Sequence, residues 1–418
     1  MLPRLLSHSL FAFFLLIIGY YYFIVPIFGY TGFQWNFSYI KLLESILIII
    51  LFEKALPRKC DRPSDFILNI HFLLPILPML VLYTVSNRSR IFMYAVLFCF
   101  YIIINLRNTS FFNIRLRKIN QNFLMNALIL ICLIYVLILF NYRGFKLNFN
   151  FFDIYMYRAM YSDSLPRFFN YLSPLVSKVF LPAAVFLCIA YRHKLAILIL
   201  IISSTLIFGY TQHKGTFFYP LFVIVLYNII KSEKAIEQLK ASYLFLLSIC
   251  MLFFYFENTI SQFIASVFFR RALLVPAELN FQYFEYFSVH KNVFWANNFF
   301  TFGLIDYPYD LPTANIMGDY INKNASNYAN TGWIGSGFMH FHFIGLFIYS
   351  VVISIVMSVL DSLSKQTGIR LVIALTFIPV LTMFISSDLP TTLITHGLII
   401  SIIIVMCISP LKIHKHEK

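Results

Sequence analysis

The chain has 418 residues, of which 60% are hydrophobic and only 12% are charged, and its formal net charge is +15. A soluble globular domain carries about 25% charged residues, so this composition excludes an ordinary soluble protein and indicates a polytopic membrane protein. Cytoplasmic loops of such proteins collect Lys and Arg, and no basic motif with interleaved aromatic residues is present. We therefore expect no nucleic-acid partner.

Apolar runs of about 20 residues follow one another along the chain and predict about twelve transmembrane helices. We interpret the first run as an uncleaved helix, because no small-residue cleavage site follows it. The expected fold is all-α, a single integral membrane domain over residues 1–418. The expected helices fall near 10–28, 38–56, 66–86, 91–106, 123–140, 173–190, 195–211, 216–231, 241–257, 341–360, 369–386 and 391–409.

Short basic segments between alternate helices indicate the cytoplasmic side. With the N terminus inside, KALPRKCDRPSD (54–65), YRHK (191–194) and KSEKAIEQLK (231–240) all lie in the cytoplasm. The opposite orientation would place them outside, against the positive-inside rule, so we expect both termini to be cytoplasmic. Two outer loops are long, 141–172 and 258–340, and structureless connectors of such length in a compact protein are commonly functional.

Motifs for nucleotide binding, zinc proteolysis and serine hydrolysis do not occur in the chain. The six cysteines show no metal-ligand spacing. His340 and His342 form an HxH pair, which is a weak metal signal without a nearby cysteine or carboxylate. We expect neither a metal nor another cofactor.

Four of the cations on the predicted outer side are candidates for binding an anion. Arg158 follows the aromatic stretch DIYMY, Lys214 lies in the turn TQHKGTFFYP, and Arg270 and Arg271 precede an aromatic-rich helix. One interpretation is contact with lipid headgroups, which suits long basic side chains at an interface. The other is an anionic substrate, and four cations together could neutralise a lipid diphosphate.

Two residues are candidates for a general base. Glu278 lies in the aromatic-rich helix, on the same face as Glu285, and burial among apolar rings can tune a carboxyl toward neutral pH. His340 lies in ANTGWIGSGFMHFHFIGLF (329–347), which we expect to open a helix near Asn330. The small residues of this stretch favour close helix packing, and a second interpretation makes the stretch the floor of an active site.

Taken in order, these segments resemble the Wzy-type O-antigen polymerases of bacterial inner membranes. The resemblance is carried by DIYMYR (153–158), TQHKGTFFYP (211–220), RRALLVPAELNFQYFEYF (270–287) and NIMGDY…ANTGWIGSGFMHFHFIG (315–345), with a large outer loop before the last three helices. The chain departs from the family at His342 or nearby, where Gly is usual. It also has two arginines where the family has one, which leaves open whether Arg270 or Arg271 is functional.

The resemblance implies a fold similar to that of the C-type membrane glycosyltransferases. Such enzymes transfer a growing glycan from one undecaprenyl diphosphate carrier to the next lipid-linked repeat unit, on the periplasmic side of the inner membrane. A chain-length regulator and a flippase are expected partners, together with membrane lipid.

Transfer from an anomeric diphosphate needs cations for the leaving group and a base for the acceptor hydroxyl. We expect the diphosphate to be bound by the four outer cations, Arg158, Lys214, Arg270 and Arg271. We expect Glu278 or His340 to act as the base. The residues expected to line the substrate are Tyr155, Tyr283 and Asn330.

Two alternatives to the polymerase stay open. An O-antigen ligase shares the lipid donor and the topology but uses a lipid A-core acceptor. A flippase or other transporter for lipid-linked oligosaccharide belongs to a different class, and charges along a central path through the membrane would favour it.

Overall fold

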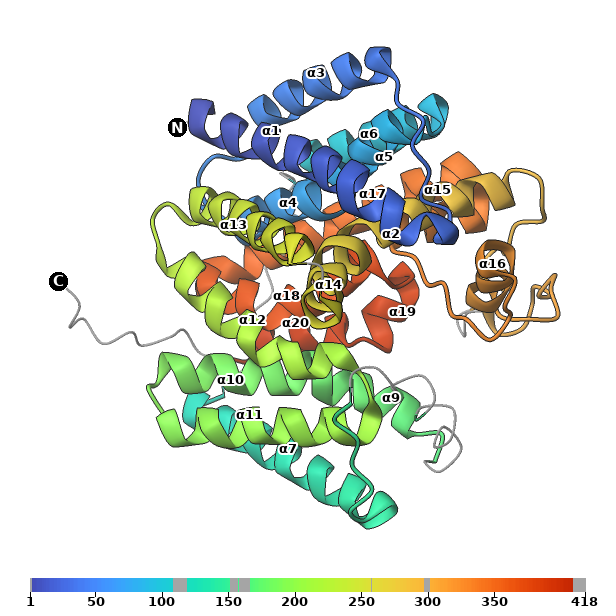
Figure 1. The fold of residues 1–418 in the computed structure, drawn as a ribbon. Coiled ribbons are helices and arrows are strands. Elements are labelled where there is room, and N and C mark those ends of the chain that lie inside the picture. The colour runs from blue at the N-terminus through green and yellow to red at the C-terminus, as the bar shows by residue number, and fades with distance from the viewer. Residues whose placement is uncertain are drawn as a thin grey trace. The chain divides into compact units, whose positions relative to one another are not determined.

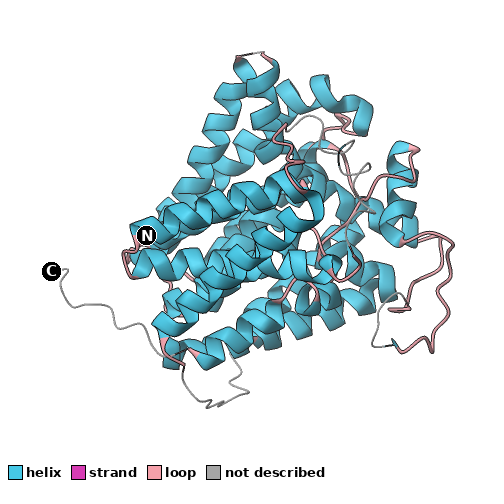
Figure 2. Ribbon diagram, turned by 90° about the horizontal axis from the view of Figure 1, so that it is seen from below, coloured by secondary structure: helices cyan, strands magenta, loops and turns pink. Residues whose placement is uncertain are grey.

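The computed structural model describes residues 2–107, 119–150, 157, 166–256, 258–296 and 301–408. All regular elements within these ranges are helices, and no strand occurs among them (Figure 2). Nine of the described helices are long and apolar enough to cross a membrane. The chain is therefore an all-α, multi-pass membrane protein, as its composition predicts.

The chain divides into two compact units, of which the first comprises Met1–Phe111, Glu233–Ser358 and Thr382–Pro390. Its helices, with most of the last one, are α1 (Leu2–Gly19), η1 (Tyr20–Ile24), α2 (Val25–Phe28), η2 (Gly29–Thr31), α3 (Tyr39–Ala55), α4 (Pro63–His71), η3 (Phe72–Ile76), α5 (Leu77–Val85), α6 (Arg90–Leu106), α13 (Ala235–Tyr255), α14 (Thr259–Ala265), η6 (Ser266–Leu274), α15 (Val275–Phe287), α16 (Thr313–Asn322) and α17 (Trp333–Thr367).

The continuous helix α4–η3–α5 is the centre of this first unit. Of its most apolar window, 94% is buried, against 33% for the first helix of the chain. Helix α5 packs against α1, α3, α6 and α15, and α1 also packs against α13 (Figure 1). An apolar helix that is buried on all sides needs no polar face, which explains why its stretch from Phe72 to Tyr83 carries only apolar and aromatic side chains.

The second unit comprises Phe112–Ser232, Val359–Leu381 and Thr391–Lys418. Helices α7, α10, α11 and α12 form its packed body (Figure 1). Its helices, with most of α18 and α19, are α7 (Gln121–Arg143), α9 (Phe169–Leu175), η5 (Val176–Phe180), α10 (Leu181–Ala190), α11 (Lys194–Thr211), α12 (Lys214–Lys231), α18 (Ile369–Ile385), α19 (Leu389–Ile394) and α20 (Leu398–Cys407).

Four of the long helices in the described ranges contain a π-helical segment, and each segment has a proline two residues beyond its end. The pairs are η1 with Pro26, η3 with Pro78, η5 with Pro182 and η6 with Pro276. A proline has no N–H, and its ring clashes with the carbonyl four residues earlier. That carbonyl lies inside the π segment in every case, so the wider turn gives the ring room without ending the helix.

Each helical range expected from the sequence overlaps a described helix, and the range near 391–409 is divided between α19 and α20. Eight of the nine candidate spans match an expected helix, and the ninth, Thr259–Phe287, lies inside the expected outer loop 258–340. Arg90–Leu106 and Ile369–Ile385 are apolar but shorter. The number of membrane crossings, given above as about twelve, stays a prediction, as do the single domain over 1–418 and the glycosyltransferase fold.

Candidate functional site

Glu278 belongs to a cluster of charged side chains in the first unit, together with Arg88 and Glu285. Arg88 Nη1 donates to Glu285 Oε1 at 2.8 Å, and Nη2 donates to Glu278 Oε1. The side chains are graded in depth, with exposed fractions of 39% for Glu285, 19% for Arg88 and 5% for Glu278. The cluster therefore runs from the surface to a buried carboxylate.

Local structure explains how the three residues meet. Glu278 and Glu285 are seven residues apart in α15, which places them on one face, as the sequence predicted. Arg88 lies in the short connection between α5 and α6, directly before Ser89, whose hydroxyl accepts from the Phe92 amide at 3.3 Å and caps α6. Lys41 Nζ donates to the Arg88 carbonyl at 2.5 Å, so the connection is held at both its backbone and its guanidinium.

The Glu278 carboxylate is only partly used within the described residues. Oε1 accepts from Arg88 and, at 3.1 Å, from Gln282 Nε2, whereas Oε2 is buried and has no protein partner there. Buried polar atoms are nearly always hydrogen-bonded, so a buried carboxylate oxygen with spare accepting capacity needs an explanation. Chemically, it can accept a proton from a hydroxyl that is brought within hydrogen-bond reach.

Arg88 remains charged in this setting. Burial alone would lower the pKa of Arg88, but Glu278 and Glu285 outweigh burial and hold that pKa above its usual value. A permanent positive charge beside Glu278 stabilises the ionised form of the carboxylate. The guanidinium also fixes the position of Oε1, which leaves Oε2 as the carboxylate oxygen without a protein partner among the described residues.

His340 lies in a second network, and both of its ring nitrogens have partners. The Trp295 amide donates to Nδ1 at 3.0 Å, and Nε2 contacts Asp388 Oδ2 at 3.1 Å. Asp388 Oδ1 accepts from the Tyr349 hydroxyl at 2.7 Å, and that hydroxyl accepts from Trp295 Nε1 at 2.8 Å. An imidazole that accepts at Nδ1 carries its proton on Nε2, so it has no nitrogen free for an acceptor hydroxyl.

The small residues around His340 serve close packing. A Cβ at Gly332 would lie 2.3 Å from the carbonyl oxygen of Phe384, and one at Gly345 would lie 1.9 Å from that of Gly337. Of the two interpretations of this stretch, packing is confirmed. The expected helix begins at Trp333 and is not straight, because Phe341 and His342 have non-helical dihedrals.

The hydrogen bonds of Glu278 described above come from Arg88 and Gln282, and neither of the predicted arginines, Arg270 and Arg271, is among these partners. Arg270 Nε donates to Ser266 Oγ at 3.1 Å, and its guanidinium lies 4.1 Å from the centre of the Phe28 ring. Arg271 is exposed. Both belong to the π-helical η6, which follows α14 and leads into α15. The structure thus gives Glu278 a cationic partner, Arg88, that is different from either predicted arginine.

The remaining predicted residues fall at different places. Tyr283 is buried, and its hydroxyl donates to the Ala329 carbonyl at 2.9 Å, beside the exposed Asn330. These two predicted lining residues are therefore neighbours. Lys214 is the first residue of α12 and belongs to the second unit. Tyr155 and Arg158 lie outside the described residues.

Sequence reasoning missed Arg88 and Asp388. A signal for Arg88 was present, because a cation in the short connection 86–89 on the predicted outer side breaks the positive-inside rule, and the same argument selected Lys214. Asp388 had a weaker signal as the only carboxylate between two of the last helices. Within the part of the chain that the structure describes, no group of three or more His, Cys, Asp or Glu side chains could hold a metal ion. No protein-family model, curated protein or solved structure matches this chain.

Proposed function

We propose that this protein polymerises undecaprenyl-diphosphate-linked oligosaccharide repeat units on the periplasmic side of a bacterial inner membrane, with both termini in the cytoplasm. The observation that carries the proposal is the buried Glu278 carboxylate, whose Oε2 has no protein partner among the described residues while Arg88 holds Oε1. The family resemblance over residues 150–360 supplies the substrate class. The all-α, multi-pass architecture is compatible with a lipid-linked substrate.

In the proposed reaction Glu278 is the general base. Oε2 takes the proton from the acceptor sugar hydroxyl, and the resulting oxygen forms a bond to the anomeric carbon of the donor. The bond between that carbon and the diphosphate oxygen breaks, and its electron pair leaves with undecaprenyl diphosphate. Arg88 is a positioning residue, because it acts on Glu278: its positive charge favours the ionised form of the carboxylate, and its guanidinium orients the carboxylate through Oε1.

The leaving diphosphate needs positive charge close to its oxygens. Arg158, Lys214, Arg270 and Arg271 stay our proposed ligands for it. Arg270 has support from its setting, because a half-buried guanidinium over the Phe28 ring is partly shielded from water, where its attraction to an opposite charge is stronger than in bulk water. His340 is not the base in this proposal, because both of its ring nitrogens are occupied.

The test uses the purified full chain in detergent with a polyprenyl-diphosphate-linked repeat unit. A ladder of lengthened glycans is expected from the wild type. Glu278→Gln keeps the size and the Arg88 contact but cannot accept the proton, so kcat should fall about 10²- to 10⁴-fold. The matched control is Glu237→Gln, which removes a carboxylate that pairs with the exposed Arg4 in the same unit.

Three outcomes contradict the proposal. An unchanged ladder in Glu278→Gln would remove the base assignment. Transfer only to a lipid A-core acceptor would identify a ligase. No transfer by folded protein, combined with movement of the lipid-linked oligosaccharide across a liposome membrane, would identify a flippase.

A further inference from the structure

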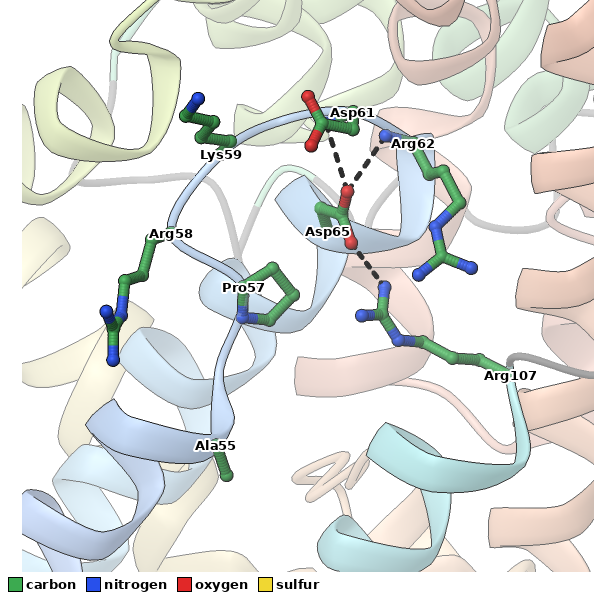
Figure 3. Close-up of a pocket in the computed structure, with 8 residues that line it drawn as sticks. All are labelled: Ala55, Pro57, Arg58, Lys59, Asp61, Arg62, Asp65 and Arg107. Carbon is green, nitrogen blue, oxygen red and sulfur yellow. Dashed lines mark hydrogen bonds and ion pairs between the residues drawn. The ribbon is translucent and has the colours of Figure 1, made fainter.

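A cavity of about 610 Å³ lies in the first unit, where the connection after α3 meets the start of α4. In Figure 3, Asp65 lies between this connection and the guanidinium of Arg107. The cavity is rich in charged side chains and also has two apolar residues on its wall. Its lining residues are Ala55, Pro57, Arg58, Lys59, Asp61, Arg62, Asp65 and Arg107.

The carboxylate at the base of the cavity is already neutralised. Asp65 Oδ1 accepts from Arg107 Nη1 at 2.6 Å, and Oδ2 accepts from the backbone N–H groups of Asp61 and Arg62 at 3.0 and 2.9 Å. The Arg107 and Asp65 side chains are only 7% and 5% exposed, so this pair fixes the shape of the connection. Among the other lining residues three cations face one carboxylate, and the cavity as a whole favours an anion.

An apolar row on α3 leads directly into the cavity. Leu43, Leu47 and Leu51 are spaced by four residues, and their exposed fractions are 69%, 56% and 54%. Ala55 continues the row, is exposed, and lines the cavity. Residues four apart lie on one side of a helix, so the row is a continuous apolar surface that ends beside the charged residues.

The cavity lies at the opposite end of the helices from the Glu278 cluster. Helix α4–η3–α5 begins at Pro63, beside the cavity, and ends at Val85, close to Arg88, after a rise of about 35 Å. Helix α6 repeats this relationship in reverse, because Arg88 precedes it and Arg107 follows it. The charge pattern predicts that the connection 54–65 is cytoplasmic, and with this predicted orientation the cavity is at the inner membrane surface.

We propose that this cavity binds the phosphate of an anionic membrane lipid from the inner leaflet. The exposed Arg58 and Lys59, with Arg62, supply the charge for the phosphate, and one acyl chain lies along Leu51, Leu47 and Leu43. Basic cavities beside transmembrane helices on the cytoplasmic side suit acidic headgroups. A free phosphate ion would use the same cations but would gain nothing from the apolar row. We therefore favour a lipid over a free phosphate ion as the ligand, because only a lipid has an acyl chain to cover this row.

The experiment measures lipid binding to the purified full chain in detergent, titrated with phosphatidylglycerol and followed by native mass spectrometry and thermal unfolding. Phosphatidylglycerol should bind and raise the Tm, whereas phosphatidylcholine should not. In Arg58→Gln/Lys59→Gln, phosphatidylglycerol binding should weaken about thirtyfold. Each basic residue near an acidic headgroup strengthens binding about five- to sixfold, and the variant removes two of them. Both side chains are exposed, so the variant keeps the buried Arg107–Asp65 pair and its fold.

The matched control is Arg192→Gln/Lys194→Gln, which removes an exposed arginine and lysine from another predicted cytoplasmic connection. This control should bind phosphatidylglycerol like the wild type. Leu47→Asn in the apolar row should weaken the binding of phosphatidylglycerol but leave any change in Tm caused by inorganic phosphate as it is in the wild type. Equal weakening in both double variants would mean general attraction to acidic lipid, and an equal Tm rise from inorganic phosphate alone would mean a phosphate-ion site; either result overturns the proposal.

Discussion

Gly337 and Gly345 face each other across the bend of α17, and a Cβ on Gly345 would lie 1.9 Å from the Gly337 carbonyl oxygen. No side chain fits at that separation, so Gly345→Ala must push the two arms of the bend apart. Overpacking of a tight contact costs about 1–3 kcal/mol. Thermal unfolding of the detergent-solubilised protein should show a clear loss of stability.

Gly29 provides the control for this prediction. It also lies in an apolar helical segment, but a Cβ there would meet nothing within 4 Å. Gly29→Ala should leave the Tm within a degree or two of the wild type, because it adds no contact that must be relieved. Equal Tm values for the two variants would show that the close approach at Gly345 is not important for stability.

His342 occupies a backbone conformation that favours glycine, with φ 50° and ψ −134°. A residue other than glycine in this conformation costs about 1–3 kcal/mol. The His342 ring compensates in part, because Nε2 donates to the Phe287 carbonyl at 2.8 Å. His342→Gly loses the hydrogen bond and the strain together, and we expect the free energy of unfolding to change by less than about 1 kcal/mol.

His342→Ala separates these two effects. It loses the same hydrogen bond but keeps the strained φ, so it should be less stable than His342→Gly by about 1–2 kcal/mol. The measurement is chemical denaturation of both variants in the same detergent. An alanine variant as stable as the glycine variant would mean that the bend is not strained.

Glu53 and Lys240 form an ion pair in which each side chain is only 1% exposed, with Nζ 2.6 Å from Oε2. Ser9 also donates to the Glu53 carboxylate at 2.5 Å. Lys240→Met leaves a buried charge without its partner, and we expect a loss of about 3–5 kcal/mol. The double variant Glu53→Gln/Lys240→Met removes both charges and should recover most of this loss.

The exposed pair Arg4–Glu237, at 3.4 Å, is the comparison. It joins α1 to α13, two of the three helices that the buried network of Ser9, Glu53 and Lys240 connects. Arg4, however, is 72% exposed. Arg4→Met should therefore cost less than about 1 kcal/mol. Similar losses in Arg4→Met and Lys240→Met would argue that burial does not determine the strength of these pairs.

Asp388 introduces a pH dependence. Burial by itself raises the pKa of Asp388. The electrostatic interaction with His340, and the hydrogen bonds that Asp388 accepts from His340, Tyr349 and Ser336, together outweigh burial and hold this pKa below its usual value of 3.8. An acid with a lowered pKa in the folded state stabilises the fold above its unfolded pKa, and this stabilisation is lost as pH falls through the folded pKa. We expect the contribution of Asp388 to be constant from pH 7 to about 5 and to decrease below pH 4.

Asp388→Asn isolates this contribution from that of other carboxylates. At pH 7 it should be less stable than the wild type by about 2 kcal/mol, because hydrogen bonds to a charged group are lost. Thermal unfolding at a series of pH values should show this difference shrinking between pH 4 and 3. A difference that stays constant to pH 3 would show that the ionised carboxylate is not what the network stabilises.

Some parts of the site could be predicted from the sequence, and the parts that could not be predicted depend on contacts between distant segments. Glu278 and Glu285 could be placed on one face, because helical periodicity is local. The partner of Glu278 could not be found this way, because Arg88 is 190 residues away along the chain and only the packing of α15 on α5 brings them together. His340 stood out as a polar residue in an apolar run, but its role depends on Trp295 and Asp388, which come from two other segments.

The sequence by itself determined the class of this protein, because its apolar runs are too long and too frequent for a soluble fold and indicate an all-α membrane protein. This class could be predicted because hydrophobicity and helical periodicity depend only on residues that are neighbours along the chain. The tertiary structure alone decided which charges meet. It paired Arg88 with Glu278, enclosed His340 between Trp295 and Asp388, bent α17 at His342, and joined the apolar face of α3 to a cationic cavity. Each of these depends on contacts between distant segments, which side-chain packing selects and local pattern does not encode.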